Sequence, residues 1–166
     1  NGGSGNLFTE KEYADFNFRF EFQLTPGANN GLGIRAPLEG DAAYVGMELQ
    51  ILDNTANKYK DLHNYQYHGS VYGVNKKKKG FLKPVGEWNT FFIRMVGERV
   101  TIKLNDRLVV DNTVLENFWE RALPVYPRGQ IELQNHGNTL YFRNLCIREI
   151  PAEEANTRLA KKDAQY

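Results

Sequence analysis

Phe16-Asn17-Phe18-Arg19-Phe20-Glu21-Phe22-Gln23-Leu24 is the stretch that decides the fold of this 166-residue chain. Apolar residues occupy every second position of the stretch, and polar residues fill the positions between them. Successive side chains of a strand point to opposite faces, so a period of two predicts a β-strand with one buried and one solvated face. The phenylalanine face needs a covering layer, and we expect it to pack between two sheets.

Further strand patterns follow on both sides, separated by turns rich in Gly, Pro, Asn and Asp. The sequence predicts strands over residues 6–9, 14–24, 31–35, 44–53, 69–72, 90–96, 100–104, 108–110, 130–136 and 140–150. About ten short strands with almost no helix predict an all-β sandwich or jelly roll. We expect one domain over residues 1–151. Residues 152–166 lack a core pattern and are interpreted as a tail or a short surface helix.

Composition argues against several classes of function. The net charge is only +1, so no global field favours nucleic acid, and no apolar run is long enough to span a membrane. The sequence contains no phosphate-binding loop, dinucleotide fingerprint, zinc-ligand spacing or nucleophile elbow. Cys146, the only cysteine, lies in an apolar strand pattern, which predicts a buried and inert thiol.

Polar residues that could carry chemistry lie on three of the predicted strands. Within Tyr44–Asp53, Glu48 and Gln50 share one face, and strict alternation would point Asp53 away from them. A bulge near Leu52 would bring Asp53 back to their side. The other interpretation is an ordinary solvent face on an edge strand. The further candidates on strand faces are Arg35, Gln134 and His136.

The long polar segment over residues 54–68 adds His63 and His68, and the strand predicted after it ends at Tyr72. Loops of this length in compact domains are usually functional or mobile. Carboxylates, amides and aromatic rings suit a sugar, because its hydroxyls form hydrogen bonds and its apolar face stacks on rings. We therefore expect carbohydrate as the partner.

Several motifs resemble the 3-keto-disaccharide hydrolase family, formerly a domain of unknown function, from residue 6 to residue 151. They are Glu48–Asp53, Gly69–Tyr72, Lys83–Asn89, Leu104–Asp111, and Ile131–Gly137 followed by Tyr141–Asn144. The resemblance implies a concanavalin A-like jelly roll of two antiparallel sheets, with a concave face that holds carbohydrate. It also implies a bacterial protein exported to the periplasm or cell surface. By the same resemblance, we expect the usual start of the family, a segment with a strand before residue 6, to be shortened here.

The same fold houses laminarinase-like glycosidases, whose strand motif is Glu-x-Asp-x-x-Glu. On that pattern Glu48 takes the nucleophile position, Gln50 the middle Asp and Asp53 the acid/base. Gln50 cannot ionise, and a retaining mechanism needs carboxyl groups about 5 Å apart, which Asp53 would reach poorly. Ordinary double displacement is therefore not favoured.

Cleavage of a 3-keto sugar needs fewer catalytic groups than double displacement does, because the ketone acidifies the proton on C2. We assign Glu48 as the base, Arg35 or His136 as the stabiliser of the enolate, and Asp53 as a further catalytic candidate. We expect substrate to bind against Arg35, Gln50, His63, His68, Tyr72 and Gln134. A divalent metal could replace the stabilising groups, and the sequence leaves this open. The alternative is a carbohydrate-binding module without catalysis on the same fold.

The run Lys76–Lys79 is interpreted as a solvated loop. Replacing all four lysines by serine is expected to change the free energy of unfolding by roughly a few tenths of a kcal/mol, because exposed charges contribute little. Urea unfolding measures this difference. A large loss of stability would show that the lysines are part of the packed structure.

Overall fold

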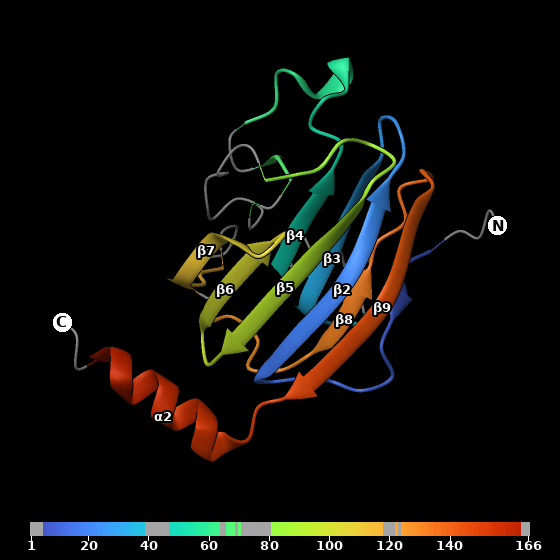
Figure 1. The fold of residues 1–166 in the computed structure, drawn as a ribbon. Helices are drawn as coiled ribbons and strands as arrows, with labels where there is room; N and C mark the ends of the chain where they lie inside the picture. The colour runs from blue at the N-terminus through green and yellow to red at the C-terminus, as the bar shows by residue number, and fades with distance from the viewer. Residues whose placement is uncertain are drawn as a thin grey trace.

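The chain forms a sandwich of two antiparallel sheets in a computed structural model that describes residues 5–38, 47–63, 66–68, 70, 81–117, 122 and 124–163 (Figure 1). The four-stranded sheet has the order β1-β8-β3-β4, and the five-stranded sheet has the order β7-β6-β5-β2-β9. The predicted all-β sandwich is confirmed. The elements are β1 (Leu7–Phe8), β2 (Phe16–Leu24), β3 (Asn29–Ala36), β4 (Met47–Leu52), η1 (Asn57–Tyr59), β5 (Trp88–Val96), β6 (Arg99–Leu104), β7 (Arg107–Val114), β8 (Gln130–Leu133), β9 (Leu140–Glu149) and α2 (Ala152–Asp163).

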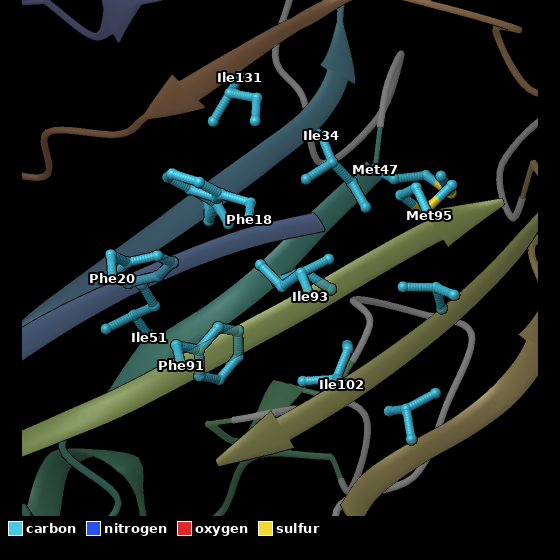
Figure 2. Close-up of a cluster of buried hydrophobic side chains, with 14 of the residues drawn as sticks. Phe18, Phe20, Ile34, Met47, Ile51, Phe91, Ile93, Met95, Ile102 and Ile131 are labelled. Atoms are coloured by element: carbon cyan, nitrogen blue, oxygen red, sulfur yellow. The ribbon is translucent and has the colours of Figure 1, made fainter. Parts of the chain in front are cut away.

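The phenylalanine face of β2 forms the centre of the core, as the alternation predicted. Strand β2 lies between β5 and β9 in the five-stranded sheet, and all four of its phenylalanines are buried. The ring centroid of Phe20 lies 5.5 Å from that of Phe91 and 5.8 Å from that of Phe142. Isoleucines of the other sheet, among them Ile34, Ile51 and Ile131, belong to the same buried cluster (Figure 2). The two sheets are therefore held together by a continuous apolar layer.

The prediction of a buried Cys146 is wrong, because the thiol is exposed. Phe142 and Ile147 both pack against the core, although an odd number of positions separates them, and they pair with Phe22 and Phe18 of β2. A bulge in β9 makes this possible, and Asn144 within it has a positive φ of 53°. The bulge reverses the alternation, so Cys146 faces outward from an edge strand.

Helix α2 packs at one end of the five-stranded sheet. Ala155 and Leu159 form a small apolar cluster with Val96 of β5 and Ile150, which follows β9. In Figure 1 the helix leads away from the end of β9. No helix in the described part of the chain is long and apolar enough to cross a membrane.

Parts of three sequence predictions fall outside the described residues. They are the lysine run Lys76–Lys79, residues 44–46 of the strand predicted over 44–53, and the strand predicted over 69–72, of which only Ser70 is described. The Ser70 carbonyl accepts a hydrogen bond from the backbone N–H of Gln50 at 3.1 Å, so this residue lies beside β4.

Replacing Phe20 by alanine is expected to lower the free energy of unfolding by about 3–5 kcal/mol, because it leaves a cavity at the centre of the sandwich. Leu108→Ala in β7 is the control. Leu108 is 38% exposed, and its truncation is expected to cost less than about 1 kcal/mol. Urea unfolding of both variants measures the difference. Equal losses would mean that the phenylalanine layer is not the main source of stability.

Candidate functional site

Acidic and amide side chains gather on the outer face of the four-stranded sheet. Strand β3 lies between β4 and β8, and Gly33 pairs with Glu48 on one side and Glu132 on the other. Residues in register on neighbouring strands share a face, so both carboxylates project to the side away from the core. Two positions further along the chain from each carboxylate, Gln50 in β4 and Gln134, which directly follows β8, project to the same side. We call Glu48, Gln50, Glu132 and Gln134 the polar face.

Glycines of β3 lie between the side chains of Glu48 and Gln50 on one side and those of Glu132 and Gln134 on the other. They form the floor of the polar face. A Cβ placed on Gly31 would lie 2.4 Å from the side-chain oxygen Oε1 of Glu48 and equally 2.4 Å from Oε1 of Gln134. The two side chains therefore converge over Gly31 from opposite strands. Any larger residue at this position would push them apart.

Hydrogen bonds fix these side chains. Gln50 Nε2 donates to Glu48 Oε1 at 2.6 Å, and a hydrogen bond of 2.8 Å joins His136 Nε2 to Gln134 Oε1. Asn6 Nδ2 donates to Glu132 Oε1. Glu48, Gln50, Gln134 and Glu132 are all buried, at 7% exposed or less, whereas His136 is exposed. The face that could have been an ordinary solvent face is therefore a layer of buried polar side chains, with the exposed His136 at its edge.

Glu132 was not among the candidates chosen from the sequence, although it is the most deeply buried member of the polar face at 1% exposed. The signal was present: Glu132, Gln134 and His136 alternate with Ile131 and Leu133 and therefore share a face. The sequence alone could not show that β3 would bring Glu132 opposite Glu48.

Arg35 does not join the polar face, which corrects its predicted place beside Glu48. Its φ is +51°, and the pairing of β3 with β8 shifts between Ile34 and Ala36. The bulge turns the side chain towards the loop before β2, where Nη2 donates to the Ala14 carbonyl at 2.7 Å and lies 3.5 Å from Asp15 Oδ1. Arg35 is 3% exposed and ties the end of β3 to the other sheet.

Asp53 also lies apart from the polar face, because the register of β3 and β4 runs without a shift from Asn29–Leu52 to Ile34–Met47. The bulge predicted near Leu52 is absent from this pairing. Asp53 instead closes a turn: Oδ2 accepts from the Gly27 N–H at 2.8 Å, and Oδ1 accepts from the Thr55 N–H at 2.9 Å and from its hydroxyl at 2.6 Å. Burial raises the pKa of the Asp53 carboxyl, but these hydrogen bonds outweigh it, and the pKa lies below its ordinary value.

The two loop histidines lie in different surroundings. His68 is 3% exposed, its Nδ1 accepts from the Leu52 N–H at 3.2 Å, and its ring centroid lies 5.3 Å from that of Phe22. It is thus part of the core between the sheets, not of the polar face. His63 is exposed, and its backbone N–H donates to Gln66 Oε1 at 3.0 Å. Tyr72 lies outside the described residues.

A metal would need several ligands close together. Among the described residues, no three His, Cys, Asp or Glu side chains are grouped so that they could hold a metal ion. In the described part of the chain, the polar face offers the carboxylates of Glu48 and Glu132 and the amide oxygens of Gln50 and Gln134.

The two antiparallel sheets agree with the concanavalin A-like jelly roll expected from the sequence motifs. The chain belongs to the family of 3-keto-alpha-glucoside-1,2-lyase-like domains, whose profile matches residues 1–148. This confirms the family resemblance of the sequence motifs. A curated relative, the 3-keto-disaccharide hydrolase of Bacteroides thetaiotaomicron, is 24% identical over 183 aligned positions that include 89% of this chain. The chain spans 62% of the length of that relative.

Solved structures share the fold at low sequence identity. A crystal structure from Parabacteroides distasonis, provisionally assigned as a glycosyl hydrolase, matches with a TM-score of 0.74 at 23% identity, over 87% of this chain and 83% of that chain. The carbohydrate-binding module CBM66 from Bacillus subtilis matches with a TM-score of 0.59 at 18% identity, over 89% of this chain and 84% of that chain. At these identities the likeness shows the fold alone.

Asp53→Asn is expected to lower the free energy of unfolding at neutral pH by about 1–3 kcal/mol, because the turn loses a charged acceptor. The pKa of Asp53 is lower in the folded chain than its ordinary value of 3.8. Its contribution is therefore complete above pH 3.8 and is lost as the pH falls through the lower folded value. The wild type and the variant should converge in acid.

Urea unfolding at neutral pH and below pH 3.8 tests this expectation. The control is Asp111→Asn, which replaces an exposed carboxylate in β7. A stability difference for Asp53→Asn that stays constant with pH would contradict the assigned role of the charge.

Proposed function

We propose that the protein cleaves 3-keto-glycosides, with Glu48 as the base that removes the proton on C2 of the sugar. The observation that carries the proposal is the convergence of Glu48 and Gln134 over Gly31, on a sheet face shielded from water. Gly31 leaves room for these two side chains, and a ligand bound over them would contact the Glu48 carboxylate directly. Exclusion of water also strengthens the interactions of the carboxylate with the reacting sugar.

The reaction begins with transfer of the C2 proton to Glu48. The electrons of the C2–H bond form an enolate with the C3 ketone, and the enolate then expels the oxygen on C1. This step breaks the glycosidic bond, forms a double bond between C1 and C2, and regenerates the ketone. The departing oxygen takes up a proton. A lyase stops here, whereas a hydrolase adds water to C1 and returns a proton to C2.

Neighbouring groups have distinct parts in this scheme. Gln50 donates to one oxygen of Glu48 and thereby orients the carboxylate. Donors for the enolate oxygen would come from the amide of Gln134 or from His136, because Arg35 points into the loop before β2. Hydrogen-bond donors aimed at a developing oxyanion are usually a large term in catalysis.

Glu132 supplies a second carboxylate across the floor. It and Glu48 flank the same glycine, so their Cα atoms are separated by two interstrand spacings, roughly 10 Å. A sugar ring bound over β3 would then have a carboxylate on each side. In its protonated form, Glu132 would transfer its proton to the departing oxygen, as general acids do in glycoside cleavage, and become a carboxylate.

Glu48→Gln is expected to lower the turnover of a 3-keto-glycoside by about 10²–10⁴-fold, because glutamine keeps the shape but cannot accept the proton. Release of the leaving alcohol or sugar measures turnover, and calorimetry measures binding. The fold and substrate binding should persist, because Glu48 lies outside the apolar layer.

Asp53→Asn is the matched control, since it makes the same chemical change at a buried carboxylate that holds a turn. Turnover per folded molecule should be unchanged in this variant. Full activity in Glu48→Gln would refute the assignment of the base. Loss of activity in both variants with loss of fold would show a structural effect only.

A second function is a carbohydrate-binding module without catalysis. The similarity of the fold to CBM66 favours it, as does the wealth of amides on the polar face. In that case the wild type binds glycosides and releases no product from any 3-keto-glycoside. Bacterial export, implied by the family resemblance, stays a prediction for either function.

A further inference from the structure

A groove crosses the outer face of the five-stranded sheet, on the opposite side of the sandwich from the polar face. Its volume is about 350 Å³, and its walls include Arg19, Phe92, Arg94 and Lys103. Arg19 and Lys103 both pair with Phe92, one from each neighbouring strand. The ring therefore lies between two cations in one row across β2, β5 and β6. We call these four residues the outer basic groove.

The charge of the groove is unbalanced. Among the described residues, its lining holds three cations and a single carboxylate, that of Asp106, which is exposed at the turn after β6. Arg94 is half-buried and donates through Nε to Asn17 Oδ1 at 2.9 Å. Arg94 forms no ion pair with any of the described residues. Its guanidinium is held in place by a neutral partner.

Nearby arginines increase the positive field. Glu154 of α2 hydrogen-bonds to Arg148 at 3.0 Å and to Arg158 at 2.8 Å, so its carboxylate is already shared by two cations. Burial lowers the pKa of the Arg94 guanidinium. The positive charges of Arg158 and Arg148 lower this pKa further, whereas the carboxylate of Glu154 raises it. An anion in the groove would relieve this repulsion.

The groove also offers surfaces that suit a sugar ring. Phe92 is half-buried on the sheet face, and the guanidinium carbon of Arg94 lies 5.5 Å from its ring centroid. The hydroxyl side chains of Thr90 and Thr101 line the same groove. Aromatic rings take the apolar face of a sugar, and hydroxyls exchange hydrogen bonds with its rim.

We propose that the outer basic groove binds an oligosaccharide that carries carboxylate groups, such as a uronate chain. Arg19 and Arg94 would hold carboxylates through their planar guanidinium groups, with Lys103 as a further cation and Phe92 beneath a sugar ring. A peptide fits less well, because β5 is paired on both edges and has no free strand edge for β-addition.

The site is independent of the chemistry proposed for Glu48, since the two regions lie on opposite outer faces of the sandwich. The groove would retain an anionic polymer while the polar face acts on a sugar, or it would act alone in a binding module. The groove proposal therefore stands or falls separately from the function proposed above.

Calorimetric titration of the whole chain tests the proposal with tetragalacturonate, and with cellotetraose as a neutral oligosaccharide of equal length. We expect tetragalacturonate alone to bind. Arg19→Gln/Lys103→Gln should weaken that binding by about tenfold or more, because two charged contacts are lost. Phe92→Leu keeps the charge and should weaken it by roughly three- to tenfold, because the stacking ring is lost.

The matched control is Lys11→Gln/Arg128→Gln, which removes the same charge from exposed residues that pair with Glu149 and Glu12. It should change the affinity less than about twofold, because distant exposed charges are screened. Glu48→Gln should leave tetragalacturonate binding unchanged, which separates the groove from the polar face. Urea unfolding should show that every variant is folded.

Several outcomes would overturn the proposal. These are no binding of tetragalacturonate, equal weakening in the control, or loss of binding in Glu48→Gln with the groove variants unaffected. Equally tight binding of hexaglutamate would mean that the groove recognises acidic peptides instead. If sulfate at the same concentration of charge displaced tetragalacturonate, the groove would be a nonspecific anion-binding patch.

Discussion

The whole sandwich depends on keeping the phenylalanine face of β2 away from water. Phe16, Phe20 and Phe22 have no measurable exposure, and the apolar layer that they form joins both sheets. Burial of a phenylalanine stabilises a fold by about 1.5–3 kcal/mol, so this one strand is a large part of the driving force. Because most of the apolar residues pack between the sheets, both outer faces carry mainly polar side chains. Each outer face can then serve binding without weakening the core.

The two outer faces differ because of the strand at the centre of each sheet. In the four-stranded sheet, Gly31 and Gly33 remove side chains from β3, and acids and amides from β4 and β8 close over the gap. In the five-stranded sheet, β5 carries Phe92 and Arg94 instead, which leaves an open groove between long cationic side chains. The absence of side chains at the two glycines of β3 thus shapes the first candidate site, and side-chain charge shapes the second.

The period-two pattern of the sequence predicted which side chains share one face of a strand. It located the core face of β2 and placed Glu48 with Gln50, and Gln134 with His136. It failed where the backbone departs from a regular strand. A positive φ at Arg35 reversed the direction of its side chain, and the bulge that contains Asn144 reversed that of Cys146. Neither Arg35 nor Asn144 is a glycine, so the sequence did not indicate these conformations. For Asp53 a signal existed, since an Asp two residues before a Thr commonly closes a turn.

Burial of the polar face lowers the stability of the fold but orients the carboxylates for binding. Glu48 and Glu132 are buried, and burial of a carboxylate is costly unless hydrogen bonds compensate. Gln50 and Asn6 supply such bonds, and they come from the same sheet and from the segment before β1. Both carboxylates are consequently oriented before any ligand arrives, so little ordering remains for the moment of binding. The side chains stand on strands rather than on loops, and a rigid sheet holds their spacing better than a loop would. The apolar layer beneath offsets the cost of keeping charged groups in this position.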